Sequence, residues 1–172
     1  MTIHEMLTAT AKEMAARDDA FVHHANAFPA RLVSAMRTYL GASEPLVSSA
    51  LLHQPRKSPW EWEEFSGSFS ASDQDEEGFF KIAIRITFPM DGSNTFKIQP
   101  VFGFRPTHEG MEVYIMERKR DYLQKNDRFV ISWDNGEFQP LLDKSVELWG
   151  QMLRFDPFGE PKKTQLGFDL TR

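Results

Sequence analysis

The chain has 172 residues, a net charge of −5 and no cysteine. This length suits one domain with a sizeable core, and 41% hydrophobic with 26% charged residues is typical of globular proteins. The negative charge argues against binding to nucleic acid or to an anionic membrane, and the lack of cysteine excludes disulfides and thiolate metal sites. Neither a signal peptide nor a membrane-spanning stretch is recognisable, so we expect a cytoplasmic protein.

The first part of the chain, residues 1–55, is predicted to be helical. Thr2-Ile3-His4-Glu5 matches a capping box, and a narrow stripe of apolar residues at helical spacing continues to about residue 17. Further helices are expected after Asp18-Asp19, around Pro29 with a stop at Gly41, and between Ser43 and Pro55. The pattern therefore predicts several consecutive helices before the first strand.

Residues 60–133 are predicted to form an antiparallel sheet, because apolar and polar residues alternate there. Two runs, 80–88 and 96–104, each place aromatic and aliphatic side chains on one face. A two-residue loop at 91–92 would put the two sets on opposite faces, so we expect a loop of odd length with a bulge; a loop of 91–93 pairs Phe88 with Phe96 and Phe80 with Phe104. Pro100 cannot donate to a ladder, so it is expected either to face away from a partner strand or to sit at a bulge, which would change the pairing beyond it. Further strands are predicted at 60–70, 111–118 and 128–133, with a charged connection from Lys119 to Asp127.

Residues 139–153 are predicted to form the last helix, since Leu142, Val146, Trp149 and Leu153 make one apolar stripe. Residues 154–172 follow as a tail that ends in a short edge strand. The whole chain is thus predicted as a single α+β domain, 1–172. Its N-terminal helices and its C-terminal helix pack on an antiparallel β-meander of about five strands.

No residue pattern in the sequence assigns a catalytic, cofactor-binding or metal-binding role. Asp73 to Gly78 resembles the first half of a calcium loop, but position twelve is Ile84, so we interpret 66–78 as a solvated, mobile acidic loop. The five histidines are scattered, and phosphate-loop and nucleophile motifs are missing. Enzymatic activity is therefore left open by the sequence, and no cofactor is expected.

A ligand pocket between the helices and the sheet is one hypothesis. Trp60 and Trp62 share one face of the expected first strand and would stand at its mouth, with Phe80, Phe102 and Phe104 lining it. The competing interpretation is a filled core, because large aromatic faces usually pack against themselves.

The outer face of the sheet provides the other candidate site. If residues 106–109 form a four-residue turn, then Ala83, Val101 and Tyr114 lie in one apolar row across three strands, with Met116 beside it and charged residues around it. The row would either contact a second copy of the chain or form a second small core beneath the C-terminal helix or tail. The sequence thus favours a non-catalytic binding or adaptor module that acts through a sheet surface as a homo-oligomer. A small-molecule-binding protein or enzyme is the alternative.

Overall fold

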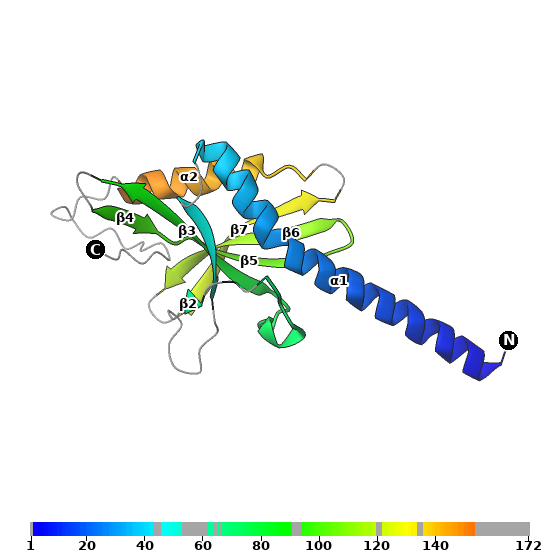
Figure 1. Cartoon of the computed structure of the whole chain (residues 1–172). Coiled ribbons are helices and arrows are strands. Elements are labelled where there is room, and N and C mark those ends of the chain that lie inside the picture. Colours follow the sequence, from blue (N-terminus) through cyan, green and yellow to red (C-terminus); the bar gives the residue numbers. More distant parts are fainter. Residues whose placement is uncertain are drawn as a thin grey trace.

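The predicted α+β class is confirmed by the computed structural model, which describes residues 2–42, 46–52, 62–63, 65, 67–90, 94–119, 122–133 and 136–153. A long N-terminal helix, α1 (Ile3–Leu40), and a C-terminal helix, α2 (Gln139–Leu153), accompany one antiparallel sheet (Figure 1).

The strands of this sheet follow the order β2-β1-β3-β5-β6-β7, and β4 also pairs with β3. They are β1 (Val47–Leu52), β2 (Trp62–Glu63), β3 (Phe80–Pro89), β4 (Thr95–Ile98), β5 (Val101–Pro106), β6 (Gly110–Lys119) and β7 (Tyr122–Ser132). A short 3-10 helix, η1 (Ala71–Asp73), precedes β3.

The predicted register around β3 is confirmed at every paired position. Phe88 pairs with Phe96, Ile86 with Ile98, Ile82 with Phe102, and Phe80 with Phe104. Pro100 lies between β4 and β5, and its carbonyl accepts a hydrogen bond of 3.0 Å from the N–H of Ile84. The register with β3 is the same on both sides of Pro100, so no bulge changes the pairing there. A single continuous apolar face therefore runs across β3, β4 and β5.

The predicted series of short helices is wrong up to Leu40, because α1 is one uninterrupted helix of 38 residues. Asp18 and Asp19 lie inside it and cap nothing, and Pro29 is accommodated within it. The sequence holds no glycine between Thr2 and Gly41, so nothing but Pro29 opposes continuation. Gly41, at φ 61°, ends the helix in the left-handed conformation that glycine adopts without strain.

The helix predicted between Ser43 and Pro55 is also wrong, and the helical part ends before residue 55. Residues 47–52 form β1, which pairs antiparallel with β3 so that Val47 lies opposite Ile86 and Leu51 opposite Ile82. Val47 is fully buried, and its carbonyl accepts two hydrogen bonds from the Arg37 guanidinium at 3.0 and 2.7 Å. The backbone groups along this edge of β3 need partners, which overrides the helical spacing of the apolar residues.

Lys119 and residues 122–127 are part of the sheet, contrary to the prediction of a charged connection from Lys119 to Asp127. β6 and β7 form a long hairpin, paired as far as Lys119 with Tyr122, with an irregularity between Tyr114 and Met116. The predicted strand at 60–70 is present as the two residues of β2, while Trp60 lies outside the described residues. The tail, 154–172, with its expected edge strand, also lies outside them.

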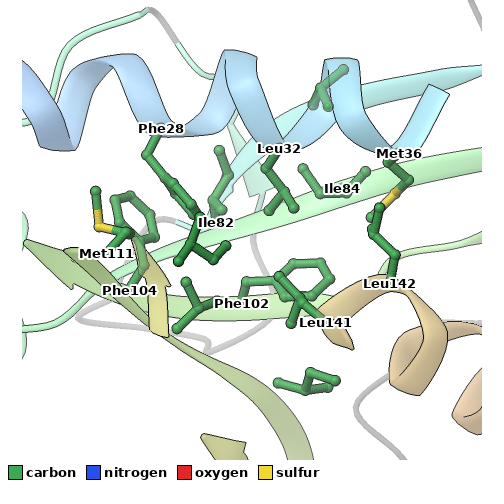
Figure 2. Packing of buried hydrophobic residues seen from close by; sticks show 14 of the residues in the cluster. Phe28, Leu32, Met36, Ile82, Ile84, Phe102, Phe104, Met111, Leu141 and Leu142 are labelled. Carbon is green, nitrogen blue, oxygen red and sulfur yellow. The ribbon is translucent and has the colours of Figure 1, made fainter. Parts of the chain in front are cut away.

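The core lies between the two helices and the inner face of the sheet (Figure 2). Phe28, Leu32 and Met36 of α1 pack on side chains of β3 and β5, and Leu141 and Leu142 of α2 close the far end. The Phe28 and Phe104 rings lie 4.7 Å apart between centroids. Each of these fully buried side chains contributes about 1.5–3 kcal/mol of hydrophobic free energy.

Candidate functional site

The first half of α1 has no packing partner among the described residues. This segment, residues 3–20, which we call the N-terminal arm, projects away from the sheet (Figure 1). All its side chains are exposed, whereas the second half of the same helix buries Phe28, Leu32 and Met36. At 1.5 Å per residue the arm is about 27 Å long. It is the longest run of consecutive exposed residues in the part of the chain that the structure describes.

A stripe of large apolar side chains runs along one side of the arm. The members of this arm stripe are Ile3 (74% exposed), Met6 (51%), Leu7 (60%) and Met14 (64%). Steps of three, four or seven residues return to the same side of a helix, so the stripe continues through Phe21 to Phe28. Phe21 is half-buried, with its ring 6.0 Å from that of Phe80. The arm stripe therefore faces the same side of α1 as the buried core residues.

The arm is helical for local reasons. The predicted capping box is confirmed: the N–H of Glu5 donates to Thr2 Oγ1 at 3.2 Å, and the N–H of Thr2 donates to Glu5 Oε2 at 2.7 Å. Five alanines, the best helix formers, occupy positions 9, 11, 15, 16 and 20. Because short isolated helices are marginal in water, an arm without packing depends on this cap and on the anchored second half.

The charges of the arm are mixed, with a small acidic excess. Four acidic side chains, Glu5, Glu13, Asp18 and Asp19, accompany two basic ones, Lys12 and Arg17. Amphipathic helices that lie on anionic bilayers carry a basic polar face instead. The described helices also include no segment long and apolar enough to cross a membrane. This charge pattern is consistent with a protein partner for the arm stripe.

The predicted apolar row on the outer face of the sheet is already covered. Val101 pairs with Met116, and Tyr114 pairs with Gly103, so the assumed turn at 106–109 and the Val101–Tyr114 pairing are wrong. The turn occupies 107–110, between paired Pro106 and Met111. Ala83 and Val101 are fully buried and Met116 is 4% exposed. The half-buried Tyr114 packs against Val101 and Met116. Val101, Met116 and Tyr114 thus form a second, smaller cluster.

Charged and aromatic side chains lie beside this cluster and interact with one another. Glu112, almost fully buried, accepts hydrogen bonds from Arg128 Nε at 2.6 Å and from Arg105 Nε at 2.7 Å. Two cations lie over the Phe79 ring, with Lys125 Nζ at 3.8 Å and the Arg105 guanidinium carbon at 4.4 Å from the ring centroid. Every charge in this set, which we call the outer-face network, has a partner within the chain.

The carboxyl group of Glu112 is held ionised by this network. Burial alone would raise its pKa, but the hydrogen bonds and positive charges of Arg128 and Arg105 outweigh burial and lower the pKa below its usual range. Asp75 shows the same balance, in which burial is opposed by the N–H groups of Phe79 and Glu77 and by Lys81 at 3.1 Å, and its pKa is also lowered. Both carboxylates thus have a structural role: Glu112 binds two arginine side chains, and Asp75 binds two backbone N–H groups and Lys81.

The candidate pocket residues lie in the core where the structure describes them. Phe80, Phe102 and Phe104 are at most 1% exposed, and the Phe80 and Phe104 rings are 5.6 Å apart. The side chain of Trp62, like Trp60, lies outside the described part. A separate open groove of about 1000 Å³ runs between the outer side of α1 and the segment 136–139; its lining includes Arg31, Tyr39 and Trp133. None of the described residues that were predicted to form the pocket lines this groove.

The described part of the acidic loop, 67–78, is held in place at two residues, Phe69 and Asp75. Phe69 is buried and packs on Phe80 at 4.9 Å, and its N–H donates to Asn26 Oδ1 of α1. Asp75 Oδ1, one of the half-motif oxygens, accepts from two backbone N–H groups. Within the described residues, no group of three or more His, Asp or Glu side chains could hold a metal ion.

Comparison of the chain with protein-family models, with curated proteins and with solved structures gives no match.

Proposed function

We propose that the protein is a non-catalytic binding module that forms homodimers through the N-terminal arm. The arm stripe carries this proposal: four large apolar side chains, each at least half exposed, lie in line with the residues that form the core. The row on the outer face of the sheet supports the proposal less well, because its residues are buried within one chain.

A second copy is the partner that fits the arm best. A narrow stripe at three- and four-residue spacing is the surface that two helices bury against each other in a coiled coil. The arm carries both signs of charge, so it favours neither a strongly basic nor a strongly acidic partner. A two-fold axis would let one stripe cover the other, which is the commonest arrangement of soluble oligomers.

The expected dimer is weak. At about 2 kcal/mol for complete burial of one such side chain, covering four partly exposed side chains on both arms gives on the order of 10 kcal/mol. Loss of translational and rotational freedom opposes association by roughly 4–15 kcal/mol. The surplus is therefore at most about 6 kcal/mol, and we expect dimers to form only at roughly tens of micromolar or above.

Sedimentation over a range of concentrations tests the proposal. The wild-type chain should shift from monomer to dimer as its concentration rises. The double variant Leu7→Asp, Met14→Asp should remain monomeric and folded, because it places two charges in the stripe but leaves the core untouched.

The matched control is Ala9→Asp with Ala16→Asp, which adds the same charge at the same seven-residue spacing on the polar side of the arm. It should associate like the wild type. A wild-type chain that stays monomeric at high concentration, or a Leu7/Met14 variant that dimerises as well as the control, would contradict the proposal.

A further inference from the structure

We infer that the two arms pair antiparallel, so that the tip of each arm lies against the base of the other, at Phe21. This inference rests on the dimer proposed above and specifies its geometry. It follows from two independent observations, the position of the sheet relative to the arm stripe and the order of charges along the arm.

The sheet excludes a parallel pair. The arm stripe and the buried face of α1 point to the same side of the helix, and beyond Phe21 that side is filled by β3 and β5. In a parallel pair, each α1 would lie on the stripe side of the other along its whole length, in the space that the sheet occupies. An antiparallel partner would lie alongside the arm alone and end where the sheet begins. Figure 1 shows the arm extending beyond the sheet.

The charges of the arm also oppose a parallel pair. Arg17 follows Met14 by three residues and so lies on the stripe side, where a parallel partner would set it against its own copy. Glu13 and Asp18 flank the stripe at the positions that face each other in parallel coiled coils, and both are acidic. Three like-charge contacts would accompany every parallel dimer.

The antiparallel register that uses the whole arm places Ile3 opposite the partner's Phe21. Leu7 then lies opposite the partner's Arg17, whose aliphatic stem can cover it, and Thr10 lies opposite the partner's Met14. Asp18 comes beside the first turn of the partner helix, where the helix dipole favours a negative charge.

One like-charge contact remains in this register, between the two copies of Glu13 across the two-fold axis. Arg17, four residues further along the same helix, is placed to offset it. The antiparallel pair therefore carries fewer unfavourable contacts than the parallel one.

Spin labels on introduced cysteines test the orientation, since the chain has no cysteine of its own. Thr8→Cys, Lys12→Cys and Asp19→Cys each place one nitroxide on the polar side of the arm. In the antiparallel pair the two labels are separated along the axis by about 0 Å at position 12, about 12 Å at position 8 and about 21 Å at position 19. Distances measured in the dimer by pulsed electron resonance should therefore increase in the order Lys12, Thr8, Asp19.

The possible results separate the inference from the proposal on which it rests. Three equal distances would show a parallel pair, which overturns the inference and retains the dimer. No measurable distance at a concentration where sedimentation finds dimers would show that the arms are not in contact, which overturns both. Labelled chains that remain monomeric at concentrations at which the wild type should dimerise would also overturn both.

Discussion

The two halves of α1 both carry large apolar side chains on the same side of the helix, but the surroundings of these side chains differ. Phe28, Leu32 and Met36 in the second half are fully buried against the sheet and α2. From Ile3 to Met14 the large apolar side chains are at least half exposed, although they point to the same side of the same helix. An apolar stripe along a helix therefore indicates a surface that is buried against a partner. In this chain the described residues bury only the second half of the stripe.

The largest expected difference in stability between the two halves comes from replacing one leucine by alanine in each half. Leu32→Ala should lower the free energy of unfolding by about 2–5 kcal/mol, because it opens a cavity in the core. Leu7→Ala should change it by less than about 0.5 kcal/mol, because Leu7 is exposed in the monomer. Urea unfolding of dilute samples measures both. Equal losses would mean that the arm is packed within its own chain.

The dependence of folding stability on pH tests how Glu112 stabilises the sheet. The pKa of Glu112 is lower in the folded protein than in the unfolded chain, so its stabilisation is present above the unfolded pKa and is lost as pH falls through the folded pKa. Glu112→Gln should cost about 2 kcal/mol at neutral pH, since charged hydrogen bonds from Arg105 and Arg128 are lost. The difference from wild type should shrink as the pH falls from the unfolded pKa through the lower folded pKa of Glu112. A difference independent of pH would contradict this role of Glu112.

A smaller effect is expected at the end of the anchored half. Gly41 has φ 61°, and a Cβ at this position would meet no atom within 4 Å, so Gly41→Ala strains only the backbone. We expect a loss of about 1 kcal/mol in the free energy of unfolding. A variant as stable as wild type would show that the helix can end elsewhere.

The smallest effect is expected at the start of the arm. Thr2→Ala removes the side-chain acceptor of the capping box, which weakens the first turn by about 1 kcal/mol. The first turn is exposed and does not pack on the rest of the described chain, so faster amide exchange should be confined to it and global unfolding should not change. Loss of global stability would show that the cap supports more than the arm.

The sequence predicted best those elements whose pattern leaves one choice. The alternation from Phe80 to Phe104 fixed the register of β3 with β4 and β5, because a shift by one residue would turn the apolar set outwards. The capping box at Thr2, the stop at Gly41 and the last helix were predictable from local chemistry.

The remaining errors came from tertiary contacts that the sequence does not show. Val47 to Leu52 has helical spacing, yet it pairs with the edge of β3. The β5–β6 turn was misplaced, which moved Tyr114 from Val101 to Gly103. The apolar stripe at Ile3, Leu7 and Met14 was visible in the sequence, but its exposure depends on how far the sheet extends along α1.

Amide hydrogen exchange at several protein concentrations tests the central claim most directly, because it follows both halves of α1 in one sample. We predict that amides of the arm, 7–20, exchange rapidly in dilute protein and become protected as concentration rises. Amides of residues 28–40 should stay equally protected throughout, since their cover belongs to the same chain. Exchange in the arm that is independent of concentration, whether fast or slow, would contradict the claim that a second copy covers its stripe.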